Sequence, residues 1–274
     1  MLDSRYLLTD EQMVQFITKG YLVLRNDLPN ALHDKVFRQI QTVLAEEGNP
    51  GNNILPRIPE IQKFFDTPTV QGALSSILGP DYYLHPHRHC HYNPPGNPNP
   101  GGGAWHKDGF WNAVRSHRPW WAMIFYYTQD MTEELGPTAV LPGSQYLETF
   151  PGREEEAVLP AGPAGTMVLV HFDIWHRATH NRSRTDRFML KFQFARRSAP
   201  AFPSWNNKTA RMPIPEASAE GPVHLWLDVW SWLRGERPEE ERAAAGLNVE
   251  SDGVAGIVRT VAGSGGGASR ERAY

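Results

Sequence analysis

Cysteine is almost absent from this sequence, and that absence limits the kinds of site it can build. The 274 residues include one cysteine, Cys90, so an internal disulfide is excluded. A cysteine cage for a metal is excluded for the same reason, and any bound metal must be held by His, Asp or Glu side chains. A single cysteine is also typical of a protein that works in a reducing compartment.

Long apolar runs and a strong excess of one charge are missing as well. No stretch reaches the eighteen or so apolar residues of a membrane helix, and Asp3, Arg5, Asp10 and Glu11 interrupt the apolar residues near the start. The net charge of -3 and the pI near 6.4 favour neither nucleic acid nor an anionic membrane as a partner. We therefore expect a cytoplasmic protein that binds a small-molecule substrate. The sequence leaves its oligomeric state open.

The first third of the chain has the patterns of helices. Thr9 and Gln12 fit a capping box that begins a helix, and Gly20 ends it before a short β-like run over residues 21–24. Apolar residues at steps of four predict a second helix after Pro29, and residues 68–78 predict a third. From Asp81 onward, short β-rich runs alternate with Gly and Pro clusters, which favours an antiparallel sandwich or barrel.

Two of these β-rich runs carry polar residues at alternate positions, which places them on one face of a strand. In the second run the polar face is either exposed to solvent or lines the inside of a ligand-holding barrel, and alternation cannot distinguish the two. The positions on this face are His85, His87, His89, His91 and Asn93 in the first run, and Arg187, Met189, Lys191 and Gln193 in the second.

The end of the chain differs in composition from the rest. Residues 223–233 predict an amphipathic helix that covers the barrel, and the segment beyond them is polar or rich in small residues. With 40% apolar residues the chain can bury one large core. We predict a single catalytic domain over residues 1–245 and a disordered tail over residues 246–274.

A His-x-Asp step at His106 and Asp108 is the strongest candidate for a metal site. It follows an eleven-residue run of only Asn, Pro and Gly, and in an extended strand both side chains point to the same face. Two histidines and one carboxylate form the usual ligand set of a non-haem iron(II) centre that activates oxygen. The third ligand could be His171, His176 or His180, and His176 is favoured because Arg187 follows eleven residues later.

Further motifs accompany the His-x-Asp step in a fixed order: the helix-then-strand opening, the Gly136-Pro137-Thr138 step, Leu141-Pro142-Gly143-Ser144, and His176 followed by Asn181, Ser183 and Arg187. With these motifs, over about residues 8–196, the chain resembles the phytanoyl-CoA dioxygenase family of iron(II)- and 2-oxoglutarate-dependent oxygenases. The resemblance implies a mainly β fold with flanking helices, a double-stranded β-helix of the jelly-roll or cupin-like type.

The resemblance also implies a role for individual residues. His106, Asp108 and His176 correspond to the iron ligands, and Arg187 corresponds to the residue that binds the distal carboxylate of 2-oxoglutarate. A guanidinium suits that role because it offers a planar fork of donors and keeps its charge when buried. Asn93 corresponds to an amide that contacts the cosubstrate. No separate acid or base is assigned, so the iron centre itself is the catalytic group.

The activity implied is the oxidation, most simply the hydroxylation, of a small or medium organic substrate by Fe(II), 2-oxoglutarate and O2, with release of succinate and CO2. The family acts on acyl-CoA thioesters, amino acid derivatives and natural products. The chain has no basic patch of the kind that binds CoA, which favours specialised metabolism. Asp108 argues against halogenation, because related halogenases have a small residue there. Ala178 and His89 depart from common family residues, so the cosubstrate site is expected to differ in detail.

Other interpretations of these residues remain. The four histidines over residues 85–91 could themselves bind a metal, but neighbours on one strand face lie about 7 Å apart, so we interpret them as pocket lining with His89 nearest the substrate. Phe110 and Trp111 are further candidates for the substrate pocket. His106 and Asp108 could be an ordinary surface pair. The alternative function is a non-catalytic jelly-roll protein that binds a carbohydrate or similar ligand.

Overall fold

A computed structural model describes residues 3–25, 28–108, 116–215 and 221–236 of the chain. The α-helices in these ranges are α1 (Asp10–Lys19), α2 (Asn30–Glu47), α3 (Ile54–Arg57), α4 (Gln62–Phe65), α5 (Pro68–Leu78) and α6 (Val223–Leu233). The strands are β1 (Tyr21–Leu24), β2 (Tyr83–Asn93), β3 (Trp121–Tyr127), β4 (Ala139–Val140), β5 (Met167–His171), β6 (His176–Arg177) and β7 (Arg187–Ala195). Five short 3-10 helices complete the described elements: Ser4–Tyr6, Gly51–Asn53, Pro59–Ile61, Ser144–Tyr146 and Glu154–Glu156.

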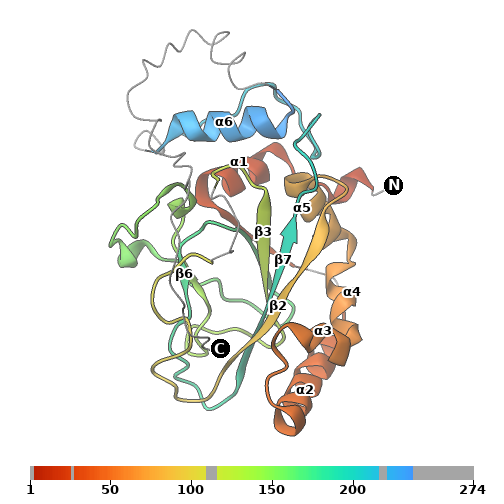
Figure 1. Cartoon of the computed structure of the whole chain (residues 1–274), viewed down its shortest axis with the longest axis vertical. Coiled ribbons are helices and arrows are strands. Elements are labelled where there is room, and N and C mark those ends of the chain that lie inside the picture. The colour runs from red at the N-terminus through yellow and green to blue at the C-terminus, as the bar shows by residue number, and fades with distance from the viewer. Residues whose placement is uncertain (1–2, 26–27, 109–115, 216–220, 237–274) are drawn as a thin grey trace, which may run out of the picture. The chain divides into compact units, whose positions relative to one another are not determined.

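The main sheet has five strands in the order β1-β5-β3-β7-β2, and each neighbouring pair is antiparallel. A smaller antiparallel pair, β4 with β6, lies on the side of the main sheet away from α4 (Figure 1). Two further bridges extend the smaller pair: His106 pairs with His176, and Val158 pairs with Val140. The described residues therefore form a mainly antiparallel β structure with helices packed against it, as the sequence predicts.

The helical elements form as the N-terminal patterns indicate. Thr9 caps α1 with a complete capping box, and Gly20 ends the helix in the left-handed conformation with φ of 78°. In α2, Val36 and Ile40 are fully buried, in agreement with the predicted apolar stripe. The helices cover one face of the main sheet. The strand side chains on that face, among them Ile124 of β3, form one core with the apolar side chains of the helices.

The burial of strand β7 shows whether its polar face is exposed to solvent or lies inside the protein, which alternation could not decide. All nine residues from Arg187 to Ala195 are buried, so the polar face of this strand is inside the protein and not exposed to solvent. Phe188, Leu190, Phe192 and Phe194 belong to the core beneath the helices. Met189 packs in a second apolar cluster with side chains such as Phe125 and Val140, on the face turned to the smaller sheet. Arg187, Lys191 and Gln193 share that inner face with Met189.

Strand β2 pairs with β7 along its length, but the register shifts between Leu84 and Arg88. Beyond the shift His89 lies opposite Lys191, His91 opposite Met189, and Asn93 opposite Arg187. The irregular segment carries His85 and His87. The predicted histidine face of this strand is therefore on the same side of the main sheet as the polar face of β7.

A buried carboxylate joins the start of α1 to the segment after β7. Asp10 accepts hydrogen bonds from the Trp205 indole at 2.7 Å, from the Asn207 amide at 3.0 Å, and from the backbone N–H groups of Lys208 and Thr209 at 2.9 and 3.0 Å. Burial would raise the pKa of Asp10, but these donors outweigh it and lower the pKa below its ordinary value.

Replacing this carboxylate should destabilise the protein in a pH-dependent way. We expect Asp10→Asn to lower the free energy of unfolding by about 2 kcal/mol at pH 7, since an amide cannot accept from all of these donors. A lowered pKa stabilises the fold above the unfolded-state pKa near 3.9, and that contribution is lost as the pH falls through the folded-state value. Urea unfolding of parent and variant at pH 7 and pH 3.5 measures the difference, which should shrink at the lower pH. An equal difference at both values would contradict this account.

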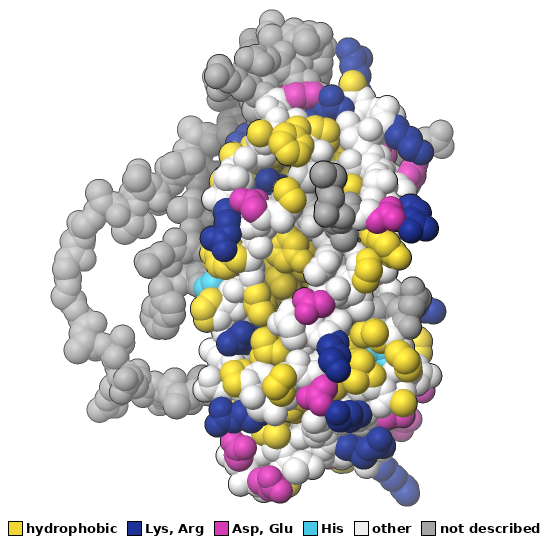
Figure 2. Space-filling model, turned by 90° about the vertical axis from the view of Figure 1, so that its right-hand side faces the viewer, with side chains coloured by type: hydrophobic (Ala, Val, Ile, Leu, Met, Phe, Trp, Pro, Cys, Tyr) yellow, Lys and Arg dark blue, Asp and Glu magenta, His cyan; other side chains and the backbone are white. Residues whose placement is uncertain are grey.

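The surface of the described residues has no strongly charged patch on the side drawn in Figure 2, and none of their helices could cross a membrane. In the described part of the chain no helix is long and apolar enough to cross a membrane. On the side that carries α4 and α5, basic and acidic side chains are interspersed and do not gather into a patch of one sign (Figure 2). The predicted disordered tail over residues 246–274, and the boundary of the catalytic domain at residue 245, lie outside the described residues and stay predictions.

Candidate metal centre

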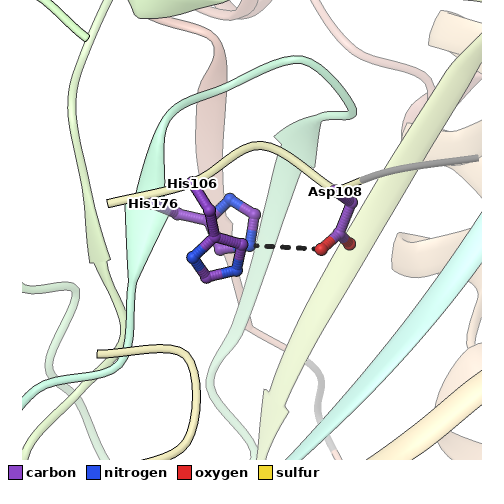
Figure 3. Close-up of side chains that lie close together, drawn as sticks. All are labelled: His106, Asp108 and His176. Atoms are coloured by element: carbon purple, nitrogen blue, oxygen red, sulfur yellow. Dashed lines mark ion pairs between the residues drawn. The ribbon is translucent and has the colours of Figure 1, made fainter. Parts of the chain in front are cut away.

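Three predicted ligands converge between the two sheets. His106 and Asp108 lie on the segment after the Asn, Pro and Gly run, and His176 begins β6. One possible ligand atom from each residue lies within 4.8 Å of the others. The His176 Nε2 atom is 3.7 Å from an Asp108 carboxylate oxygen, and the side chains point toward one another (Figure 3). The mutual backbone hydrogen bonds of His106 and His176, both 3.0 Å, fix the two segments side by side.

Both imidazoles are oriented by hydrogen bonds to the backbone carbonyl two residues earlier in the chain. The Nδ1 atom of His106 donates to the Ala104 carbonyl at 2.8 Å, and the Nδ1 atom of His176 donates to the Ile174 carbonyl at 3.0 Å. These bonds fix the tautomer and leave each Nε2 lone pair available for a metal. Burial lowers the pKa of His176 to about 4, so this imidazole is neutral at pH 7, as a ligand must be.

The carboxylate of Asp108 is held by two side chains from β7. Lys191 Nζ donates to its two oxygens at 2.9 and 2.7 Å, and the Gln193 amide donates to one of them at 3.2 Å. Burial would raise the pKa of Asp108, but the charge and hydrogen bonds of Lys191, together with the neighbouring His176 and His106, outweigh burial and hold the pKa well below its usual range. Asp108 is therefore ionised, and its carboxylate is oriented by side chains of β7.

The donor set fits ferrous iron. Two imidazole nitrogens and one carboxylate oxygen match the 2-His-1-carboxylate pattern of non-haem iron(II) oxygenases, in which the remaining coordination positions stay open for other ligands. The chemistry of the residues present thus agrees with the iron predicted from the sequence.

The rival histidines are placed elsewhere. His171 uses both ring nitrogens within the fold: Nε2 donates to the His117 carbonyl at 3.2 Å, and Nδ1 accepts from the Asp173 N–H at 3.0 Å. In the described ranges, the one group of three metal-capable side chains that meets is His106, Asp108 and His176. The histidines of β2 line up along their strand, with ring centres of His87 and His89 6.3 Å apart, and are not gathered about a point.

Arg187 lies farther along the inner face of β7 and is 1% exposed. Its guanidinium donates to the Gly136 carbonyl at 3.1 Å and to Thr138 Oγ1 at 3.3 Å. Burial lowers the pKa of Arg187, but an arginine keeps its proton in proteins. Within the described ranges no carboxylate lies at ion-pair distance from it. A buried cation without an anion is costly, which makes Arg187 suited to an anionic ligand.

Gly136 and Asn181, which the family resemblance singled out without a physical reason, both have structural roles around Arg187. Gly136 supplies the carbonyl that Arg187 binds, and it has φ of 79° with no room for a Cβ, which would lie 2.6 Å from the His180 carbonyl oxygen. Asn181 is fully buried, and its amide bonds the carbonyls of Asn93 and Thr185 at 3.0 and 2.8 Å. It thereby joins the segment before β7 to the end of β2.

The remaining predicted residues have mixed outcomes. Asn93 is buried and lies opposite Arg187 in the β2–β7 register, while its side chain bonds the Thr179 carbonyl and the Asn97 amide. His89 lies opposite Lys191 and is half-buried on the same side of the sheet. Phe110 and Trp111 lie outside the described residues. The assignment of all four to cosubstrate or substrate stays a prediction.

Sequence reasoning missed Lys191 and Gln193 as parts of this site. Their alternation with Phe192 placed them on the polar face of a strand, but nothing in the spacing indicated that Asp108, more than eighty residues earlier, would meet them. A lysine at a position that is expected to be buried in a strand indicates that an acidic partner lies nearby, because lysine is almost never fully buried without one.

Comparison with known proteins places the chain in a family. The profile of the phytanoyl-CoA dioxygenase (PhyH) family matches residues 37–189, which is more than half of the chain. The protein therefore belongs to this family of non-haem iron, 2-oxoglutarate-dependent oxygenases, as its motifs indicated. No curated protein sequence matches the chain.

Solved structures share its fold at low sequence identity. The non-heme monooxygenase ThoJ, as a nickel complex, is 18% identical with a TM-score of 0.52, covering 85% of this chain and 98% of its own. The non-heme alpha-ketoglutarate-dependent carbocyclase SnoK from nogalamycin biosynthesis is 18% identical with a TM-score of 0.57, covering 72% and 87%. The epimerase SnoN, in complex with Fe3+, alpha-ketoglutarate and nogalamycin RO, is 15% identical with a TM-score of 0.55, covering 68% and 83%.

Proposed function

We propose that this protein is an Fe(II)- and 2-oxoglutarate-dependent dioxygenase that oxidises a small or medium organic substrate, with release of succinate and CO2. The observation that carries the proposal is the meeting of His106, Asp108 and His176 ligand atoms within 4.8 Å, with both Nδ1 atoms committed to carbonyls. Membership of the PhyH family supports the same activity. We further propose that the two sheets form a double-stranded β-helix, or jelly roll.

Each residue of the centre has a defined task in this proposal. His106, Asp108 and His176 would hold the iron, and Arg187 would bind the distal carboxylate of 2-oxoglutarate. Asn93, which lies opposite Arg187, would contribute to the same cosubstrate site. When iron, 2-oxoglutarate and O2 are bound, the centre supplies an oxidant able to attack a C–H bond while 2-oxoglutarate is decarboxylated.

The chain's own residues prepare this chemistry. The fixed tautomers of the two imidazoles and the bonds from Lys191 and Gln193 to Asp108 set the ligand geometry in advance, so little reorganisation accompanies metal binding. The burial of Arg187 and the apolar cluster around Phe125, whose ring centre is 5.6 Å from that of His176, limit the access of water on this side of the centre. Related halogenases have a small residue at the position of the carboxylate ligand. This chain has Asp108 there, so we propose oxygenation as the outcome.

A turnover assay tests the proposal without knowledge of the substrate. The full chain is incubated with Fe(II), 2-oxoglutarate and air, and succinate is measured by chromatography against a sample with a chelator. We expect slow, iron-dependent succinate formation, because the centre can decarboxylate 2-oxoglutarate without a substrate. A protein that only binds a carbohydrate or similar ligand would form none above the chelator control. That result would remove the enzymatic proposal.

A further inference from the structure

We propose that Lys191 is a substrate-binding residue and that the substrate carries a carboxylate or a similar small anionic group, held next to the iron. This inference rests on the proposed function and extends it to the class of substrate. It starts from an unusual arrangement, in which a lysine that is 5% exposed bonds both oxygens of a metal-ligand carboxylate.

The first step of the argument is the balance of charge on the inner face. Arg187, Lys191 and Asp108 are its charged side chains among the described residues that contact the centre. With ferrous iron bound, the metal and the two basic side chains carry four positive charges. Asp108 and the 2-oxoglutarate dianion carry three negative charges, so one positive charge is left. A buried charge without a counter-charge is costly, and an anionic substrate would neutralise it.

The second step locates that charge at Lys191. Arg187 would be neutralised by the distal carboxylate of 2-oxoglutarate. Lys191 is paired with Asp108, with Nζ–O distances of 2.9 and 2.7 Å. A metal held by His106, Asp108 and His176 would share that carboxylate, so the attraction between Asp108 and Lys191 would weaken. The ammonium of Lys191 is then the group with the most to gain from a new anion.

The third step is the surroundings of Lys191, which favour an anion. His89 of β2 and Phe125 of β3 lie opposite it in the two neighbouring strands. Burial, and after it the charge of Lys191, lowers the pKa of both His87 and His89. Neutral imidazoles and the side-chain amide of Gln193 can donate to a carboxylate without adding charge.

Buried polar atoms without partners lie on the same face. Gln193 Oε1 and His91 Nε2 have no hydrogen-bond partner within the described residues, although native proteins rarely leave such atoms unpaired. Exposure also differs across the face: Arg187 and Lys191 of β7 are buried, whereas His85, His87, His89 and His91 of β2 are half-buried. A polar ligand would therefore approach Lys191 from the side of the β2 histidines.

The geometry also restricts where the substrate is oxidised. Lys191 Nζ is one hydrogen bond from the carboxylate of Asp108, so an anion bound to Nζ would lie within about two hydrogen-bond lengths of that ligand oxygen. The C–H bond that reacts must itself lie close to the iron. It should therefore be only a few bonds from the anionic group, as in a small carboxylic acid.

A binding experiment with simple probes tests this proposal. The full chain is loaded anaerobically with Fe(II) and saturating 2-oxoglutarate, and the metal-to-ligand charge-transfer band is recorded during titration with acetate, propionate or phenylacetate. The primary amides of the same acids are titrated in parallel. We expect the acids to perturb the band saturably and the amides to have at least about tenfold weaker effect, since they lack the charge.

Variants assign the effect to one side chain. Lys191→Met should weaken the binding of the acids by at least tenfold, and Lys191→Arg should recover part of the loss because it keeps the cation. Lys63→Met, at an exposed position on α4, is the matched control and should bind the acids like the parent. Band intensity at saturating iron is recorded for each variant, so that probe affinities are compared at known metal loading.

Each result decides a different point. Equal responses to acids and amides, no response to the acids, or unchanged acid binding in Lys191→Met would overturn the inference. A Lys191→Met variant that lost iron affinity while its residual complex bound the acids like the parent would also overturn it, and would show that Lys191 only orients Asp108. If the parent itself showed no band with Fe(II) and 2-oxoglutarate, the proposed function would fail and the inference would fail with it.

Discussion

Replacing His176 by alanine should weaken Fe(II) binding by at least about 100-fold and abolish iron-dependent succinate formation. Removal of a residue that only supports a metal ligand typically costs 10–100-fold in affinity or activity, so loss of a ligand should reach or exceed the upper end of that range. His176 is 3% exposed, and a water molecule entering its place would meet Phe125 and the apolar cluster. Iron affinity is measured by anaerobic titration with a competing chelator.

His171→Ala is the matched control for this prediction. His171 is also buried, five residues earlier in the chain, and its two ring nitrogens bond to His117 and Asp173. Its removal should lower the thermal stability of the protein and leave Fe(II) affinity within a few fold of the parent. If His171→Ala lost iron while His176→Ala retained it, the ligand assignment would be wrong.

Replacing Arg187 by methionine should weaken 2-oxoglutarate binding by about 100-fold, with Fe(II) binding retained. Removing one partner of a buried, hydrogen-bonded charge pair costs about 2–5 kcal/mol, and each 1.4 kcal/mol is a factor of ten. Arg187→Lys should give an intermediate loss, because it keeps the charge and loses the planar fork of donors. The dissociation constant of 2-oxoglutarate is obtained by titrating the Fe(II)-loaded protein and following the charge-transfer band.

The stability of the cosubstrate-free protein provides an independent check on Arg187. Because no carboxylate in the described part of the protein balances this buried charge, its cost offsets part of what the two hydrogen bonds of Arg187 contribute, and removal of Arg187 should lower stability only modestly in the absence of 2-oxoglutarate. The matched variant Arg196→Met removes another buried arginine, which donates to the Ile77 carbonyl at 2.9 Å and lies over the Trp232 ring. That variant should be less stable than the parent and bind 2-oxoglutarate normally. The reverse pattern would show that Arg187 is structural.

Local signals in the sequence predict the helices and much of the site. The capping box at Thr9 and the step-of-four stripe of α2 specify structure through contacts within one turn, so they can be recognised without knowledge of the fold. The His106-x-Asp108 step is local in the same sense, since alternate residues of an extended segment share a face. His176 is distant in sequence, and only its spacing to Arg187 and the family resemblance singled it out.

The features that sequence reasoning missed all depend on pairing between distant segments. The contact of Lys191 and Gln193 with Asp108 follows from the register of β7 and from the path of the segment before residue 109, and no short-range rule fixes either. Strands β4 and β6 have two residues each, too few for any period to appear. The shift in β2 between Leu84 and Arg88 is likewise invisible in an alternation that continues across it.

The central claim is that His106, Asp108 and His176 bind iron in a form that accepts 2-oxoglutarate. The most direct measurement is an anaerobic optical titration of the full chain with Fe(II) and 2-oxoglutarate, compared with the Asp108→Ala variant. We expect the parent to develop a weak metal-to-ligand charge-transfer band that saturates at one iron per chain, and the variant to show little or none at the same iron concentration. A parent protein without the band, or an Asp108→Ala variant with an undiminished band and the same iron affinity, would contradict the account.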